Sequence, residues 1–587
     1  MKKFFSTFLA ALIGSVAGGL LLLLVFIGLI VGIASMGESE VKIKPKTVLW
    51  LDLTGEIVER SSNNPFEDML GNLSGDAKQI GLNDLLANIK KAARDENIAG
   101  IHLESGLLMA GYATIEEIRN ALLEFKKSGK FIYSFAPIYT QKAYYLASVA
   151  DKVYLPPMGM LEFNGIHSQN VYFKGMLENV GVDMQIVRHG KFKSAVEPFM
   201  LDKMSDASRL QTEKYVFSIW NGMLQKIAIQ RNISESELNA LVDMGPVFAD
   251  QQILVDKGLI DGLKYKDEVL SELKEKLDVE EKDDIEAVTH AKYTKVYVSG
   301  ETKGLAKDKI AVIYAEGEID GSSSGGIQSD ELSRTIRIAR RDSSIKAIVL
   351  RINSPGGSAL GSELIWREVK LAQESKPTVV SMGDLAASGG YYIACAADSI
   401  VAQPNTLTGS IGIFGMIPNT GELMKKIGLS FDGVKTNKFS DLPSLTRPFT
   451  SDERDLMQSY IERGYDVFLK RCADGRHTTT ASIDSVGQGR VWAGVNALEI
   501  GLVDKIGGLD DAIGIAKRMA KLEKYRIVEL PEVPDPFEEL VKELTGDAKM
   551  YFGKMILGEE YEYMKILRTM QGRDQIQARL PYDISLN

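Results

Sequence analysis

The sequence predicts two tandem α/β domains behind an apolar N-terminal segment. Three observations lead to this prediction. Short β-rich runs alternate with amphipathic segments, two parts of the chain match each other at a fixed offset, and a long stretch without charges precedes both. The chain has 587 residues, 45% of them hydrophobic and 25% charged, which is a typical globular composition and too long for one hydrophobic core.

The N-terminal segment is apolar enough to span a membrane. After Lys2 and Lys3 no charged residue occurs before Glu38, and residues 18–34 read GGLLLLLVFIGLIVGIA. A membrane span needs about 20 apolar residues, whereas the apolar part of a cleaved signal peptide has about 7–15. We therefore expect residues 1–36 to form an uncleaved membrane anchor, with a cleaved signal peptide as the alternative. Lysines flank both ends, so charge alone does not decide the orientation.

The two copies match over a long stretch without gaps. At an offset of 247 residues, Ile98 corresponds to Ile345, and no insertion is needed as far as Lys193. Within this stretch YYLASVAD at 144–151 corresponds to YYIACAAD at 391–398. Solenoid repeats have periods of about 20–50 residues, so this pattern indicates duplication of a whole domain.

A polar segment at 275–308 separates the copies. We place the first repeat at 45–300 and the second at 301–530. The tail at 531–587 has no partner in the first copy, and the spacing of its Leu, Tyr and Met residues predicts amphipathic helix with a packing or oligomer-contact role.

The second copy contains two glycine-rich turns that each follow a predicted strand. In VLRINSPGGSALGSEL, Gly356 and Gly357 could let backbone N–H groups approach a ligand, as in an oxyanion hole, or could simply form a tight turn. In VVSMGDLAASGGYYIACAAD, Ser388 stands between a strand and a helix. That position suits a nucleophile, and the alternative is an ordinary helix N-cap. Together the two turns are more specific than either one.

A serine nucleophile needs a base. None of the five histidines lies in a recognisable relation to Ser388, but a lysine can serve when desolvation leaves it neutral. The first copy supplies Lys193 in RHGKFKSAVEPF. The alternatives are that Lys193 is a surface lysine or pairs with Glu197 on a helix, and Lys191 is a second candidate close by.

Comparison of the repeats favours Lys193. It corresponds to Ser440 in the second copy, so that copy has no lysine there, whereas Ser388 corresponds to Gln141 in the first. Pro355–Gly357 likewise correspond to Leu108–Ala110. Each copy lacks what the other has, which predicts one site formed by both domains.

The motifs KSAVEPF, NSPGGS, AASGGYY and NTLTGSIGIFG resemble those of the signal peptide peptidase A (protease IV) family in its long, double-domain bacterial form. The resemblance covers nearly the whole chain except the tail. It implies a crotonase-like or Clp-protease-like α/β fold for each repeat and a Ser/Lys dyad that cleaves signal peptides left in the membrane. It also implies a homotetramer on the periplasmic side of the bacterial inner membrane.

The resemblance assigns roles to individual residues. The hydroxyl at position 410, in TLTGSIG, would orient the lysine, and its counterpart in the first copy is Phe163. The residues and roles that the resemblance implies are Ser388 as nucleophile, Lys193 as general base, Gly356, Gly357 and Gly389 as oxyanion-hole residues, and Ser410 as the lysine-orienting residue.

Composition and spacing argue against other classes of protein. The formal net charge of −10 argues against nucleic-acid binding, and no zinc-type Cys/His spacing occurs. We therefore expect no metal and no nucleic-acid partner. The resemblance implies peptides as substrates and no cofactor, and the apolar N-terminal segment implies membrane lipid as a partner. Two alternatives remain: a crotonase-like enzyme of acyl-CoA chemistry, and a non-catalytic membrane scaffold.

Overall fold

The computed structural model describes residues 42–61, 79–245, 250–298, 306–321, 326–532 and 576–579, together with five isolated positions between 14 and 21. Within these ranges, no helix is both long and apolar enough to cross a bilayer. The expected anchor at 1–36 lies almost wholly outside the described residues.

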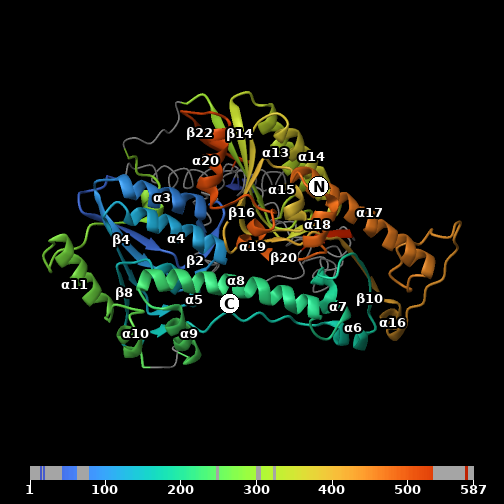
Figure 1. Ribbon diagram of the computed structural model, residues 1–587, viewed down its shortest axis with the longest axis horizontal. Coiled ribbons are helices and arrows are strands. Elements are labelled where there is room, and N and C mark those ends of the chain that lie inside the picture. The colour runs from blue at the N-terminus through green and yellow to red at the C-terminus, as the bar shows by residue number, and fades with distance from the viewer. Residues whose placement is uncertain are drawn as a thin grey trace, which may run out of the picture.

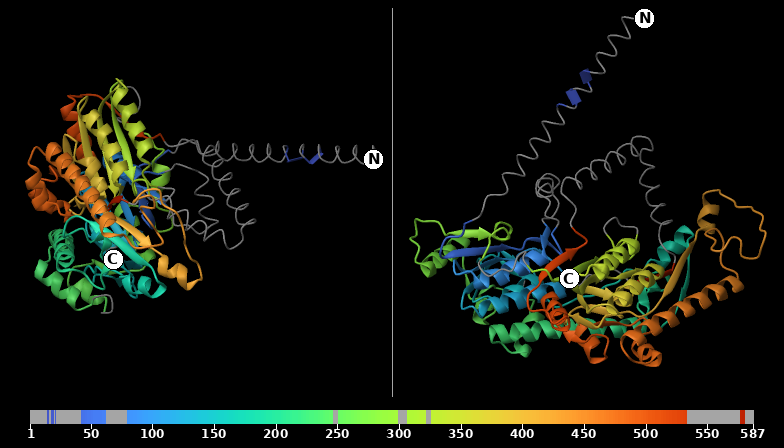
Figure 2. Two further views of the ribbon diagram at one scale, coloured as in Figure 1. Left: turned by 90° about the vertical axis from the view of Figure 1, so that its right-hand side faces the viewer. Right: turned by 90° about the horizontal axis from the view of Figure 1, so that it is seen from above.

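Two largely parallel sheets form the centres of the two repeats (Figures 1 and 2). The first has the order β11-β8-β6-β4-β1-β12, and the second repeats it as β21-β17-β16-β14-β13-β22, with β18 and β20 added beside β16. The shared order confirms the duplication. The strands of the first sheet are β1 Thr47–Asp52, β4 Ile98–Glu104, β6 Phe131–Phe135, β8 Lys152–Leu155, β11 Gly262–Leu263 and β12 Ala287–Thr289; those of the second are β13 Lys309–Glu316, β14 Ile345–Ser354, β16 Thr378–Ala387, β17 Ser399–Ala402, β18 Leu407–Gly409, β20 Val491–Ala493, β21 Lys505–Ile506 and β22 Arg526–Leu530.

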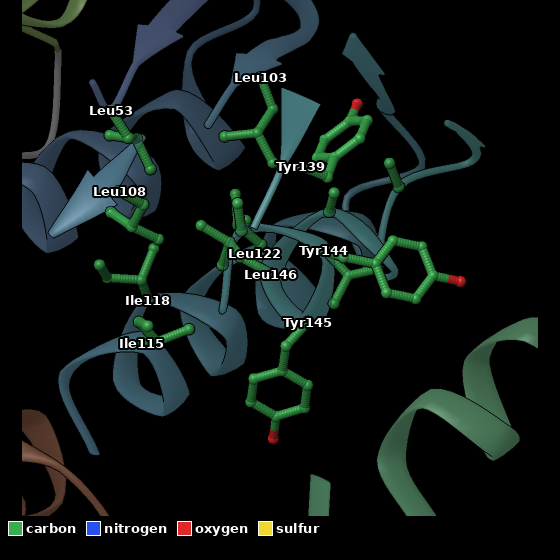
Figure 3. Packing of buried hydrophobic residues seen from close by; sticks show 14 of the residues in the cluster. Leu53, Leu103, Leu108, Ile115, Ile118, Leu122, Tyr139, Tyr144, Tyr145 and Leu146 are labelled. Carbon is green, nitrogen blue, oxygen red and sulfur yellow. The ribbon is translucent and has the colours of Figure 1, made fainter. Parts of the chain in front are cut away.

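Helices cover both faces of each sheet, as parallel sheets require. In the first repeat α4 (Tyr112–Lys126) and α5 (Gln141–Ala147) pack on one face, and α11 (Lys266–Leu277) packs on the other. Figure 3 shows Ile115 and Ile118 of α4 gathered with other buried side chains of this core. The remaining helices are α3 Leu82–Arg94, α6 Lys174–Val180, the 3-10 helix Ser194–Val196, α7 Glu197–Met200, α9 Glu235–Asp243, α10 Gln252–Asp256, α12 His290–Tyr293, α13 Ser329–Arg341, α14 Ala359–Gln373, α15 Gly389–Ala394, α16 Gly421–Lys426, α17 Ser451–Gly475, α18 Thr480–Val486, α19 Gly494–Glu499 and α20 Leu509–Met519.

One long helix, α8 (Asp206–Arg231), runs beneath both repeats (Figure 1). Ser205 caps its start by accepting a hydrogen bond from the Ser208 N–H, and its 26 residues give a length of about 39 Å. Residues of α8 lie in the core of the first repeat, while the side chain of Gln211 accepts a hydrogen bond from the Val491 N–H of the second. Helix α8 therefore contacts both repeats and helps to hold them together.

A buried ion cluster also joins the repeats. Arg351 of β14 is buried and donates to Glu59 (2.8 Å) and Glu117 (2.9 Å), both of which belong to the first copy. It also donates to Ser381 Oγ and to the Met382 carbonyl, both on the neighbouring strand β16. Removing one member would leave the others charged and buried, which is costly, so the cluster fixes how the repeats are docked.

A third, antiparallel sheet is built from distant parts of the chain in the order β10-β19-β23-β15. Its strands are β10 Asp183–Arg188, β15 Gly356–Ser358, β19 Phe414–Asn419 and β23 Ile576–Arg579. Two small sheets complete the fold, made of β2 Gly55–Val58, β3 Gln79–Gly81 and β5 Leu108–Met109, and of β7 Ile138–Tyr139 and β9 Met160–Leu161.

The tail expected to be helical at 531–587 lies outside the described residues for most of its length. Its described part at 576–579 is the strand β23 rather than a helix. These four residues pair with β15 and β19, and the stretch at 535–570 whose spacing predicts helix lies outside the described residues.

Candidate active site

The two glycine-rich turns of the second copy lie side by side. They follow β14 and β16, which are adjacent parallel strands, and Ser354 lies opposite Ala386 in the register. A side chain added at Gly390 would meet the Ser354 carbonyl oxygen at 2.7 Å. The carboxyl ends of neighbouring parallel strands meet at one edge of a sheet, so both turns lie at the same edge of the second sheet.

Ser388 occupies the junction between β16 and α15. Its backbone has φ 56° and ψ −111°, a strained conformation for a residue other than glycine. Its N–H donates to the Gly409 carbonyl at 2.8 Å, and its own carbonyl accepts from the Tyr392 N–H at 2.8 Å. The side chain makes no capping hydrogen bond to α15, so the alternative of an ordinary N-cap serine is wrong.

Gly356 and Gly357 need to be glycines for backbone reasons. Their φ angles are 101° and 155°, and a Cβ at Gly357 would collide with the carbonyl oxygen of Ile319. The Gly356 N–H donates to Ser354 Oγ at 3.2 Å, and that hydroxyl donates onward to the Gly317 carbonyl at 2.6 Å. The turn is therefore held rigidly beside the start of α15, where Gly389 follows Ser388.

Lys193 reaches this site because its segment leaves the first repeat. Strand β10, which ends at Arg188, pairs with β19 of the second copy along its whole length. The Phe192 N–H then donates to the Gln488 carbonyl at 2.9 Å. A Cβ added at Gly489 would lie 2.6 Å from Lys193 Cα, and one at Gly412 would lie 3.3 Å from Lys193 Cδ. The lysine thus runs through a slot that two glycines leave open.

The amine of Lys193 has three polar neighbours. Its Nζ lies 2.6 Å from Ser388 Oγ, 3.0 Å from the Ser410 carbonyl oxygen and 3.1 Å from Ser410 Oγ. All three residues are fully buried. Ser410 itself has φ 50°, and its N–H donates to the Arg490 carbonyl at 2.7 Å. The structure therefore brings together the serine and the lysine that the repeat comparison singled out.

Burial lowers the pKa of Lys193 well below its usual value, and no carboxylate offsets this effect. The two other hypotheses, an ion pair between Lys193 and Glu197 and Lys191 as the base, do not fit the structure. Glu197 accepts hydrogen bonds from Ser205 and faces Arg188 instead of Lys193. Lys191 is exposed, with its amine 5.2 Å from the centroid of the Phe192 ring.

The corresponding positions of the first copy are filled by packing groups. Gln141 accepts a hydrogen bond from the Gly165 N–H and donates to the Tyr112 hydroxyl. Phe163 is fully buried against Trp220, with ring centroids 5.6 Å apart. Ser440, the counterpart of Lys193, is exposed. Gln141 and Phe163 thus supply no nucleophile and no orienting hydroxyl in the first copy, and Ser440 supplies no base in the second.

Sequence reasoning missed the residues that shape the slot for the lysine. Gly412 and Gly489 leave room for its stem, Arg490 orients Ser410 through its carbonyl, and Ser354 braces the glycine turn. The run VGQGR contains Gly489 and could have signalled a close backbone approach. Among the described residues, no group of three or more His, Cys, Asp or Glu side chains could hold a metal ion.

Comparison with known proteins gives consistent matches. The model of peptidase family S49 matches residues 124–280 and 370–523, which together make up more than half of the chain. Protease 4 of Salmonella typhi is 36% identical over 544 residues, covering 90% of this chain and 87% of that protein. The chloroplastic serine protease SPPA of Arabidopsis thaliana is 34% identical over 85% of this chain and 74% of its own.

Among solved structures, a mutant of ClpP1 from Listeria monocytogenes aligns over 34% of this chain and 94% of its own, at 16% identity and a TM-score of 0.24. The family match and the two relatives agree over both repeats. The chain therefore belongs to peptidase family S49 and is a serine peptidase in which the family's domain occurs twice.

Proposed function

We propose that the chain is a membrane-anchored serine endopeptidase with a Ser/Lys dyad, which degrades cleaved signal peptides at the bacterial inner membrane. Ser388 is the nucleophile and Lys193 is the general base. The observation that carries this proposal is the 2.6 Å contact between Lys193 Nζ and Ser388 Oγ in a fully buried setting. Each repeat would have the crotonase-like or Clp-protease-like fold that the motifs imply.

The three contacts of the amine suit a neutral base. A neutral amine has two N–H groups and one lone pair. The Ser410 carbonyl can only accept a hydrogen bond, so one N–H donates there, and the other donates to Ser410 Oγ. The lone pair is then left for the hydroxyl proton of Ser388. Ser410 would orient the base in this way.

In the first half of the reaction Ser388 Oγ attacks the carbonyl carbon of the substrate peptide bond, and its proton passes to Lys193 Nζ. The carbonyl oxygen becomes an oxyanion, which accepts hydrogen bonds from the backbone amides of Gly357 and Gly389, while the Gly356 N–H donates to Ser354 Oγ and holds the turn. One such donor lowers the barrier by about 2.7–4 kcal/mol. The C–N bond then breaks, and Lys193 gives its proton to the leaving nitrogen.

In the second half water hydrolyses the acyl-enzyme. Lys193, again neutral, takes a proton from the water as its oxygen attacks the acyl carbon. The Ser388 oxygen leaves and recovers that proton from the amine. The cycle needs no proton acceptor other than Lys193, and it predicts activity that rises with pH as the amine loses its proton.

The test is peptidase activity of Ser388→Ala and Lys193→Ala on an apolar peptide, with circular dichroism to check folding. We expect both variants to be folded and inactive. Acyl-CoA thioesters serve as alternative substrates in the same assay. Cleavage of thioesters but not of peptides would favour the alternative, a crotonase-like enzyme of acyl-CoA chemistry. Failure of a serine-directed covalent probe to label residue 388 at alkaline pH would favour the scaffold.

The apolar segment at 18–34 supports the membrane-anchored part of the proposal, because an anchor confines the enzyme and an apolar substrate to one surface. We propose that residues 1–36 span the membrane and that the repeats lie on the periplasmic side. Protease added to intact spheroplasts should then digest the repeats. Digestion only after lysis would place the catalytic part inside.

We also propose that copies of the chain associate head to tail, as expected for a homotetramer. Within the chain, β19 of the second copy pairs with β10 of the first. At the repeat offset, the equivalents of these strands are residues 167–172 and 430–435. Neither segment pairs with another strand in the described parts of the chain. Residues 167–172 alternate between exposed and half-buried, and residues 430–435 are all exposed.

The two segments lie on different repeats, so pairing them between copies repeats the internal contact between β10 and β19 and makes a heterologous interface. Val171 is 65% exposed and Phe431 is 58% exposed on these segments. We expect Val171→Asp and Phe431→Asp each to give monomers in light scattering. A mixture of the two should form only dimers, because each retains one intact edge. Unchanged oligomers in both variants would contradict this assembly.

A further inference from the structure

The chain's own tail lies within the antiparallel sheet beside the site. Strand β23 at 576–579 separates β15 from β19 and pairs with both. On one side Arg579 lies opposite Gly356, and Ala578 lies opposite Gly357. On the other side Gln577 lies opposite Phe414. A four-residue backbone segment is therefore held along both of its edges.

This position coincides with the reacting groups of the proposed mechanism. Strand β15 contains the two glycines proposed for the oxyanion hole. Strand β19 pairs with β10, and the chain continues from the end of β10 to Lys193. Strand β23 also contacts α15, the helix that begins directly after Ser388. Main-chain atoms of the tail are thus held against the glycine turn at the site.

A peptidase must hold its substrate by groups that every peptide has. An extended peptide that adds to exposed strand edges is held by main-chain hydrogen bonds, and its side chains are needed only for specificity. We propose that residues 576–579 act as a built-in substrate mimic, which fills the strand position of a peptide substrate and must leave before one binds. This inference rests on the function proposed above, and it adds a means of restraining that function.

The physics of strand addition predicts a reversible restraint. Each backbone hydrogen bond is worth about 0.5–1.5 kcal/mol net, and the tail competes as a ligand tethered to the same chain. A substrate at sufficient concentration therefore displaces it. Such a competitor raises the apparent KM for a peptide and leaves kcat unchanged.

Proline at position 578 tests the proposal in the full-length chain. Because β23 is paired on both edges, each of its N–H groups faces a neighbouring strand, and proline removes one of them. Losing one hydrogen bond of about 1 kcal/mol lowers the equilibrium constant for binding of the tail about fivefold. The control is Ala578→Ser, which changes the side chain and keeps the N–H.

We expect Ala578→Pro to lower KM about fivefold at constant kcat, and Ala578→Ser to match the wild type. Hydrogen exchange of the Gly357 amide, whose neighbours Gly356 and Ser358 donate elsewhere, and of the amides at 414–415 should become faster in Ala578→Pro alone. Equal exchange in all three proteins would overturn the inference, and so would faster exchange with an unchanged KM. If none of the three cleaves peptides, the proposed function fails, and exchange still decides whether the tail occupies the sheet.

Discussion

Replacement of Lys193 by methionine separates catalysis from stability. Methionine has a similar length and no amine, so it fills the slot between Gly412 and Gly489 without a buried polar group. General base catalysis contributes about 10²–10⁴-fold, and we expect kcat to fall by that factor. The folded protein should become more stable at neutral pH, because a residue that is costly to bury has been removed.

The pH dependence of this stability gain follows from linkage. Burial lowers the pKa of Lys193 in the folded protein, whereas the unfolded chain has a lysine pKa of about 10.4. Between these two pKa values the unfolded state binds the extra proton, so the wild-type free energy of unfolding rises by about 1.4 kcal/mol per pH unit from this residue. Methionine lacks this contribution, and the advantage of Lys193→Met should shrink as pH rises and stop changing above about 10.4.

Urea denaturation of wild type and Lys193→Met from pH 7 to pH 11, with kcat measured on the same samples, checks both effects. Lys191→Met is the matched control, because that lysine is exposed, and it should change neither quantity. A stability difference that stays constant with pH would mean that Lys193 is charged in the folded protein. That result, or full activity of Lys193→Met, would refute the reasoning.

Three further variants test other parts of the structure. Ser410→Ala removes the hydroxyl 3.1 Å from Lys193 Nζ and should lower kcat about two- to tenfold at constant KM in a peptide assay, since one hydrogen bond is worth about 0.5–1.5 kcal/mol. Gly489→Ala should lower kcat much more than Gly501→Ala, because both glycines have φ 77° but only Gly489 lies against the lysine; equal losses would point to backbone strain alone. Desolvation and the nearby carboxylates of Glu59 and Glu56 raise the pKa of Glu316, an exposed residue at the end of β13, to about 7. Its protonated form stabilises the fold, and this contribution is lost as pH rises through 7, so the thermal midpoint of Glu316→Gln should exceed that of the wild type more at pH 8 than at pH 5.

The duplication made it possible to predict that Lys193 and Ser388 lie in one site. A single domain would have offered one serine and many lysines, with nothing in the local sequence to connect them. Two copies allow each position to be compared with its counterpart, and the losses at Gln141 and Ser440 point to the complementary groups that remain. The strand-to-turn-to-helix context of Ser388 was predictable for a local reason, since β16 and α15 differ plainly in pattern.

The path that carries the lysine to the serine was not predictable. Strand β10 would fit many partners by its pattern of side chains, and its pairing with β19 depends on the docking of the two repeats. The slot between Gly412 and Gly489 arises only when segments far apart in the chain meet. Strand β23 has the same origin, because two distant strand edges fix its conformation and no local periodicity does.

The order of the two halves along the chain has a consequence during synthesis. A ribosome completes residue 193 and the whole of α8 long before it reaches residue 388, so an unfinished polypeptide has the proposed proton acceptor and lacks the proposed nucleophile. A protease assembled in this way cannot damage its neighbours while it is being made. Premature termination anywhere before the second copy would leave a fragment that is harmless for the same reason.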